Sequence, residues 1–161
     1  MMLSRRGFTL VEAMVAVAVL AILALLAIPG YQNRIIREQI LEATPLTDLS
    51  KKQVVAAWTA THVLPVDNAA AGLPVPEKMV NNFVAAVSIE AGAIHVTFGN
   101  RANKLVQGKV LTLRPAIVDD APIVPIVWVC GYAPAPQNMS AKGENRTNIP
   151  PSYLPLTCQA G

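Results

Sequence analysis

Residues 1–33 read MMLSRRGFTLVEAMVAVAVLAILALLAIPGYQN, and this stretch decides the architecture of the chain. A short basic leader precedes an apolar run over residues 8–28, whose only charge is Glu12. No charge at all occurs over the 21 residues from 13 to 33. Because an α-helix rises about 1.5 Å per residue, this run can cross a hydrocarbon core roughly 30 Å thick. Arg5 and Arg6 before the run orient the N-terminus toward the cytoplasm.

The composition limits the classes of protein that fit the chain. Its 161 residues suit one domain, with 53% hydrophobic and 14% charged residues against an average charged share of about 25%. A net charge of +3 is too weak to imply nucleic acid by itself. Two Cys and two His are too few for a structural zinc site, and no nucleotide or hydrolase motif occurs. We therefore expect no metal, no cofactor and no enzymatic activity.

The carboxylate inside the apolar run needs an explanation. A secretory signal would end in a small-x-small cleavage site, but the run ends ALLAIPGYQ instead. A plain membrane anchor leaves Glu12 unexplained, because such a charge costs about 2.5–3.5 kcal/mol on insertion scales. An intramembrane carboxylate indicates a functional role with a specific partner.

Residues 6–12, RGFTLVE, followed by about twenty apolar residues, resemble the prepilin signature of type IV pilins and type II secretion pseudopilins. The resemblance implies cleavage after Gly7 by a membrane peptidase and N-methylation of the new N-terminal Phe8. It also implies that Glu12 neutralises the terminal amine of a neighbouring subunit. Pro29 and Tyr31 match the usual turn of the family near the end of the span, whereas Ala21 stands where many members have glycine.

The sequence after residue 30 predicts an amphipathic helix and then a sheet. Apolar residues recur at threes and fours, in the order Ile36, Ile40, Ala43, Leu46 and Leu49. Proline removes a helical hydrogen bond, so we expect a kink or short break at Thr44-Pro45 and a similar disturbance at Pro29. Residues 62–80, rich in Pro and Ala, are expected to form a loop.

Four strands are expected in the second half of the chain. They cover residues 84–90, 93–98, 110–114 and 126–130, with Ala91-Gly92 as a tight hairpin connection and Pro115 closing the third strand. The predicted class is α+β, with one long N-terminal helix packed on a four-stranded antiparallel sheet. The resemblance implies the ladle-shaped type IV pilin fold. Residues 131–157 lack periodicity and read as an irregular loop.

The two cysteines bracket that irregular loop. Since the body lies beyond the membrane, its compartment is oxidising, and Cys130 and Cys158 are expected to pair. Pilins have such a C-terminal disulfide loop, whereas major type II pseudopilins generally lack it. The resemblance therefore favours a pilin.

Three segments follow from this interpretation. Residues 1–7 form a leader, residues 8–29 a transmembrane helix that becomes the filament core, and residues 30–161 a headgroup. The resemblance implies an inner-membrane location before assembly, with the head in the periplasm, and an extracellular filament afterwards. The partners implied are other pilin subunits in a helical homopolymer, the prepilin peptidase and methylase, and the assembly machinery of the inner membrane.

Three functions remain open from the sequence. The first is a major pilin in a surface filament for adhesion, twitching motility and DNA uptake, with a host surface as a further partner. The second is a minor or competence pilin that binds DNA, and the third is a secretion pseudopilin. DNA binding would use four cations within fourteen residues, although a solvated strand face explains them more simply: Arg101, Lys104, Lys109 and Arg114.

Overall fold

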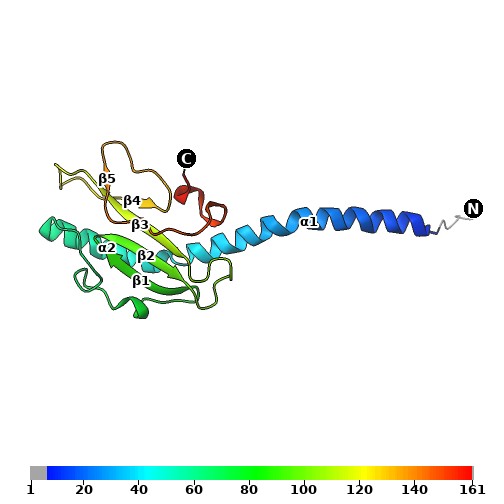
Figure 1. Cartoon of the computed structure of the whole chain (residues 1–161), viewed down its shortest axis with the longest axis horizontal. Coiled ribbons are helices and arrows are strands. Elements are labelled where there is room, and N and C mark those ends of the chain that lie inside the picture. Colours follow the sequence, from blue (N-terminus) through cyan, green and yellow to red (C-terminus); the bar gives the residue numbers. More distant parts are fainter. Residues whose placement is uncertain (1–6, 161) are drawn as a thin grey trace, which may run out of the picture. The chain divides into compact units, whose positions relative to one another are not determined.

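The structure is a computed structural model that describes residues 7–160, apart from the side chains of residues 26–29. The chain divides into two compact units, Met1–Ile35 and Ile36–Gly161. Helix α1 (Leu10–Leu41) makes up most of the first unit and continues into the second. The second unit holds helix α2 (Thr44–Thr61), a sheet and three short 3-10 helices (Figure 1).

Pro29 does not break α1, so a short break, one of the two disturbances expected there, does not occur. The helix runs from Leu10 through Pro29 to Leu41. Proline removes only the hydrogen bond to the carbonyl of Leu25. The turns on both sides of it are helical, and the helix continues across the missing bond.

The break expected at Thr44-Pro45 is confirmed. α1 ends at Leu41 and α2 begins at Thr44, with Pro45 in its first turn, where a missing N–H costs little. Pro45 cannot donate to the carbonyl of Leu41, and the hydroxyl of Thr44 donates to that oxygen instead, at 2.5 Å. A local side chain thus compensates for the bond that proline removes.

The helical face that packs on the sheet differs from the expected stripe after Ala43. Ile36, Ile40 and Ala43 are buried as expected, but Leu46 is only half-buried and Leu49 is 43% exposed. The stripe continues through Thr47, Ser50 and Val54. The hydroxyls of Thr47 and Ser50 donate to carbonyls one turn back, at 2.9 Å each, so these small residues can be buried at close approach to the sheet.

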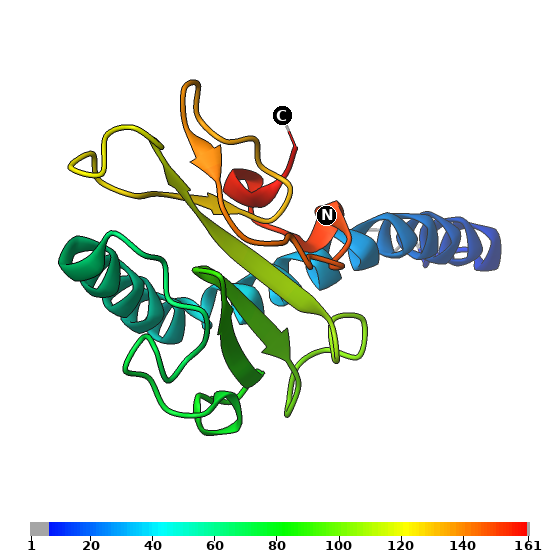
Figure 2. The same cartoon turned by 60° about the vertical axis from the view of Figure 1, so that its left-hand side comes forward.

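The sheet is antiparallel with strand order β1-β2-β3-β4, and it confirms the α+β class (Figures 1 and 2). β1 (Val84–Glu90) and β2 (Ala93–Phe98) are joined by Ala91 and Gly92, both with positive φ, as a two-residue hairpin requires. A bulge between Val84 and Ala86 shifts the register. It allows Val84, Val87 and Ile89 all to enter the core despite their uneven spacing.

β3 (Val110–Ile117) extends past the end expected from the sequence. Pro115 lies inside the strand and pairs with Trp128 of β4 (Val127–Cys130). The carbonyl of Pro115 accepts a hydrogen bond from the N–H of Lys142. This carbonyl points to the side of β3 on which β2 lies, but the pairing with β2 stops at Leu113 and does not reach Pro115. The N–H that proline lacks faces that same side, so the strand loses no bond to β2 or β4.

The C-terminal loop is more ordered than its composition suggests. A two-residue strand β5 (Ser140–Ala141) pairs with the end of β3. Residues 143–147 then cover the face of the sheet that is turned away from the helix, where the N–H of Arg146 donates to Thr112 Oγ1 at 3.0 Å. Gly143 lies so close to β2 that a Cβ there would stand 2.5 Å from the Cβ of Ala93. Both faces of the sheet are therefore covered.

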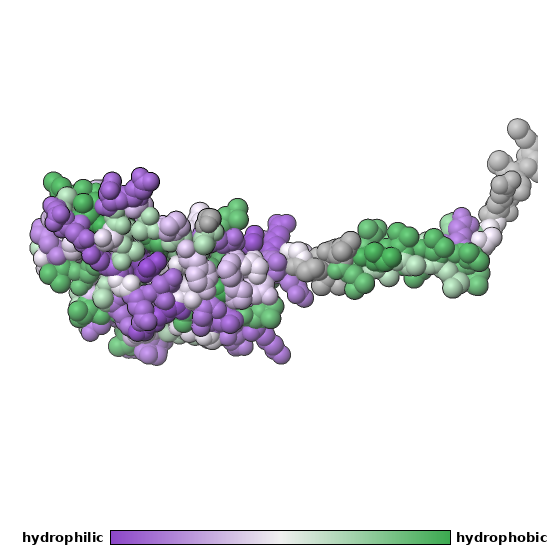
Figure 3. Space-filling model, turned by 45° about the horizontal axis from the view of Figure 1, so that its top comes forward, coloured by the Kyte–Doolittle hydropathy of each residue, from purple (hydrophilic) through white to green (hydrophobic). Residues whose placement is uncertain are grey.

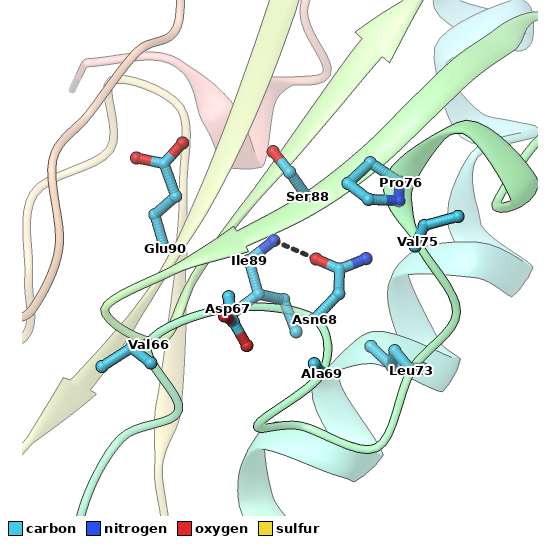
Figure 4. Close-up of a pocket in the computed structure, with 10 residues that line it drawn as sticks. All are labelled: Val66, Asp67, Asn68, Ala69, Leu73, Val75, Pro76, Ser88, Ile89 and Glu90. Carbon is cyan, nitrogen blue, oxygen red and sulfur yellow. Dashed lines mark hydrogen bonds between the residues drawn. The ribbon is translucent and has the colours of Figure 1, made fainter.

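The loop between α2 and β1 is fixed to the edge of the sheet by one buried side chain. The amide nitrogen of Asn68 donates to the carbonyls of Pro74 and Val87, and its oxygen accepts the N–H of Ile89 at 2.7 Å (Figure 4). These contacts take the place of a neighbouring strand along the free edge of β1. The hollow beside Asn68 is mostly apolar, and all polar atoms of the Asn68 side chain are already used.

Candidate functional site: an exposed apolar helix with one carboxylate

The first half of α1 exposes an apolar surface around its whole circumference. Every residue from 7 to 25 is exposed, including Phe8 at 78% and Leu10 at 80%. Figure 3 shows this stretch almost wholly in the hydrophobic colour. The helical stretch Leu10–Thr61 is long and apolar enough to cross a membrane. An apolar surface of this size requires lipid or other helices around it.

The residues around the expected cleavage position come just before this helix. Gly7 and Phe8 precede α1 and are exposed, and apart from its chain neighbours no atom of the described residues lies within 4 Å of the position that a Cβ on Gly7 would take. Arg5 and Arg6 of the expected leader lie outside the described residues.

Glu12 is the third residue of α1 and lies three positions after Thr9, the residue that caps the helix. The N–H of Glu12 donates to Thr9 Oγ1 at 3.3 Å, and the N–H of Ala13 donates to the carbonyl of Thr9. Thr9 and Glu12 have the spacing of a capping box, and a carboxylate in the first turn also suits the positive end of the helix dipole. The geometry therefore allows Glu12 a local role in addition to one between subunits.

The disulfide expected between Cys130 and Cys158 is confirmed. Their Cα atoms lie 4.5 Å apart, and the bond joins the end of β4 to the last 3-10 helix, Leu156–Cys158. The N–H of Tyr132 donates to the carbonyl of Cys158 at 2.9 Å, which adds a second link between the same segments. The loop that they bracket is held at both ends.

The four cations expected to bind DNA do not form one cluster. Arg101, Lys104 and Lys109 share the connection between β2 and β3, where the first two are exposed and the third is half-buried. Arg114 lies within β3, half-buried, with an Nε atom that has no hydrogen-bond partner in the described part of the chain. The expected DNA-binding surface is thus reduced to the three residues of one loop.

A buried polar group that was not among the candidate site residues lies under the C-terminal loop. His95 in β2 is 3% exposed, and its Nδ1 lies 2.9 Å from Thr112 Oγ1. Burial lowers the pKa of His95, and the positive charge of Arg146 lowers it further, while Glu90 and Glu144 act in the opposite direction. A neutral imidazole therefore suits this position. A lone His in a strand carries no signal from which this burial could be predicted.

The ion pairs of the same region fasten the C-terminal loop. Arg146 pairs with Glu90 of β1 and with Glu144, and Lys142 pairs with Asp119 at the end of β3. Hydrogen bonds from Lys142 and Ser140 lower the pKa of the Asp119 carboxyl. Asp119 thus has a structural partner, and among residues 7–160 no group of three or more His, Cys, Asp or Glu could hold a metal ion.

The matches to known families fall on the two features described above. Residues 2–28 match the prokaryotic N-terminal methylation motif, and residues 37–159 match the pilin family of bacterial filament proteins. The chain belongs to the type IV pilin family. The prepilin-like signature and the disulfide-closed head are therefore parts of one pilin.

Relatives of this pilin match almost its whole length. A type IV major pilin protein of Neisseria gonorrhoeae is 32% identical, over 96% of this chain and 87% of the relative. A fimbrial protein of Eikenella corrodens is 34% identical, over 96% of this chain and 91% of the relative. A type IV major fimbrial protein of Dichelobacter nodosus is 33% identical, over 67% of this chain and 81% of the relative. Pilins are structural proteins, so this chain is not an enzyme.

Proposed function

We propose that this pilin is the major structural subunit of a type IV pilus that serves adhesion and twitching motility. Residues 1–7 are a leader that is removed after Gly7, and Phe8 becomes the methylated N-terminus. Residues 8–29 hold the subunit in the inner membrane and later form the filament core, and residues 30–161 form the head. The similarity to chains named as type IV major pilins supports the choice of a major pilin.

The observation that carries this proposal is the exposure of α1. Helices that are apolar all round are stable only when lipid or other helices cover them. In the membrane, lipid covers this surface, and in a filament the same surface packs against the helices of neighbouring subunits. Transfer between the two environments exchanges one apolar environment for another, so it exposes little apolar surface to water.

Glu12 sets the axial register of neighbouring subunits in this proposal. Cleavage after Gly7 places a new amine at Phe8, one helical turn before Glu12 in the sequence. A neighbour that is staggered along the core brings its amine to this carboxylate. Single polar groups in apolar helix bundles are known to fix register, and the loss of one member of a buried pair costs about 3–5 kcal/mol.

Replacement of Glu12 tests this role. Glu12→Ala subunits are expected to be cleaved after Gly7, to remain in the membrane and to form few or no filaments, because the neighbouring amine is left buried and unpaired. Filaments are counted by electron microscopy, and cleavage is followed by mass spectrometry. Glu77→Ala, which removes an exposed carboxylate from the head, is the matched control and should leave filament numbers unchanged. Normal filament numbers in the Glu12→Ala strain would rule out the register role.

Two other assignments make different predictions about abundance. A minor or competence pilin would be a trace component of sheared filaments, whereas the major subunit is the dominant band. A secretion pseudopilin would give no surface filaments at native expression. The Cys130–Cys158 disulfide supports a pilin rather than a pseudopilin.

A further inference from the structure

The connection between β2 and β3 carries an unbalanced positive charge. No Asp or Glu occurs between residues 91 and 118, whereas four cations do. Three of these cations, Arg101, Lys104 and Lys109, lie in the compact turn of residues 99–109. Among the described residues, none of the three side chains forms an ion pair. An anionic partner outside this chain is therefore compatible with all three.

This basic turn, residues 99–109, lies at the end of the second unit where α1 enters. The N–H of Asn103 donates to Gln39 Oε1 of α1 at 2.9 Å, and the N–H of Arg101 donates to the carbonyl of Asn82. Figure 1 shows the connection from β2 to β3 beside the stretch of α1 that belongs to this unit. The turn is thus fixed at the level of Gln39, only a few residues after Ile36.

The length of the chain limits how far this level can lie from a membrane that the first part of α1 spans. Eleven residues separate Gln39 from the end of the apolar run at residue 28, and eleven residues of helix are about 16 Å long. The headgroup layer fills roughly 5–7 Å of that length. The remaining distance from the headgroup layer to the level of Gln39 is comparable with the Debye length, which is about 8 Å at physiological salt. Long Lys and Arg side chains can shorten the distance between their charges and the headgroups.

We propose that the basic turn binds the anionic phospholipid headgroups of the outer leaflet while the subunit is still in the membrane. Arg101, Lys104 and Lys109 supply the charge. Two carboxylates, Glu38 and Glu42, lie on the same stretch of helix. Glu38 already has a partner within the chain, as does the nearby cation Arg34. The three cations of the turn therefore outnumber the remaining carboxylate, Glu42. This inference rests on the proposed membrane-spanning state.

A lipid partner fits these residues better than duplex DNA does. Arg114, which would have extended the charge toward a longer phosphate track, is separated in β3 and half-buried. Three cations in one short turn suit a patch of headgroups, each cation contributing about fivefold to the affinity for an anionic surface. The contact is lost when a subunit leaves the bilayer, so anionic lipid favours the stored subunit over the assembled one.

The test measures the distance between the turn and the lipid headgroups in the full chain. Both native cysteines are in the disulfide, so Gln107→Cys provides a single labelling site on the exposed surface of the turn. A donor fluorophore is placed there, and the chain is reconstituted in bilayer discs that carry an acceptor on the headgroups. Discs of pure phosphatidylcholine are compared with discs containing about 30% phosphatidylglycerol.

Energy transfer should be higher in the anionic discs at low salt and should lose this excess in about 0.5 M salt. Arg101→Gln/Lys104→Gln should weaken the lipid-dependent contact about 25-fold, at about fivefold per charge. The control Lys51→Gln/Lys52→Gln removes the same charge from α2, at a level about 20 Å farther from the membrane than Gln39. This control should keep the full excess of energy transfer in the anionic discs.

Three results would overturn this inference and leave the membrane-spanning state intact. They are equal transfer in both lipids, an equal loss in the α2 control, and lipid-independent transfer combined with turn-dependent binding of a short DNA duplex. The last result would assign the turn to nucleic acid. A chain that fails to insert into either disc, as judged by co-flotation with lipid, would overturn both this inference and the membrane-spanning state on which it rests.

Discussion

Asn68→Ala is expected to destabilise the head strongly, because this side chain replaces a missing strand at the edge of β1. Asn68 is 6% exposed and forms three hydrogen bonds to backbone groups. Alanine would leave the carbonyls of Pro74 and Val87 and the N–H of Ile89 without these partners. The loop from α2 would then be held to the sheet mainly by apolar contacts.

The size of the effect follows from the three unsatisfied groups. A buried backbone group without a partner costs about 1–3 kcal/mol, and the hollow beside Asn68 admits water that lowers this cost. We therefore expect a loss of roughly 3–4 kcal/mol in the free energy of unfolding. With an unfolding entropy of about 2.1 cal/mol/K per residue over the unit Ile36–Gly161, a loss of 3 kcal/mol lowers Tm by about 11 °C.

The assay is thermal unfolding of the full chain in detergent, followed by the fluorescence of Trp58 and Trp128, which both lie in the head. Amide hydrogen exchange at Ile89 reports the local bond and should become faster in Asn68→Ala. Asn82→Ala is the control, because the Asn82 side chain is exposed. The reasoning would be refuted by an Asn68→Ala protein that melts within about 2 °C of the wild type and keeps the exchange protection at Ile89.

Two further predictions concern the C-terminal half of the head. The double variant Cys130→Ser/Cys158→Ser should lose about 3–4 kcal/mol in the free energy of unfolding in urea, because the disulfide closes a loop with a sequence separation of 28. The stability of the head should also fall as the pH drops from about 7 to 5, because the unfolded chain protonates His95 near its usual pKa of about 6.5, whereas burial lowers that pKa in the fold. His95→Gln should remove this component, and His62→Gln, at an exposed position, should retain it.

The outcomes that contradict these two predictions are distinct. A reduced or double-serine head that unfolds at the same urea concentration as the wild type would show that the disulfide is not needed for stability. For His95, the sign is diagnostic, since a folded-state pKa below the unfolded one makes stability rise with pH through this range. An identical pH dependence in His95→Gln and wild type would assign it to other groups. The lowered pKa of Asp119 acts in a separate window, below about pH 4.

The parts of the fold that were predictable carry local signals. The charge-free run of residues 13–33 predicts the apolar helix by length alone, and Thr44-Pro45 predicts the helix break. The strand-like composition of residues 84–90 and 93–98, with Ala91-Gly92 between them, predicts the first two strands with the bounds that the structure has. Two cysteines in an oxidising compartment leave one possible pair within the chain, and the structure confirms it.

The parts that were missed depend on residues far away in the sequence. Pro115 reads as a strand end, but β2 ends before reaching it, so its missing N–H costs no bond to that strand. Thr47 and Ser50 lie outside the apolar stripe expected from the sequence, but they bond their own helix and are buried. Asn68 gains its role only because its loop returns to β1, some twenty residues later. Such roles follow from tertiary contacts that composition and periodicity do not encode.

The intact mass of the subunit in sheared surface filaments tests the central claim most directly. The account predicts that this chain is the dominant protein of the filaments. Its mass should correspond to a chain that begins at Phe8, lacks the seven residues of the leader, carries one added methyl group and keeps the disulfide. Filaments without this chain, or a filament subunit whose N-terminus is any residue other than Phe8, would contradict the account.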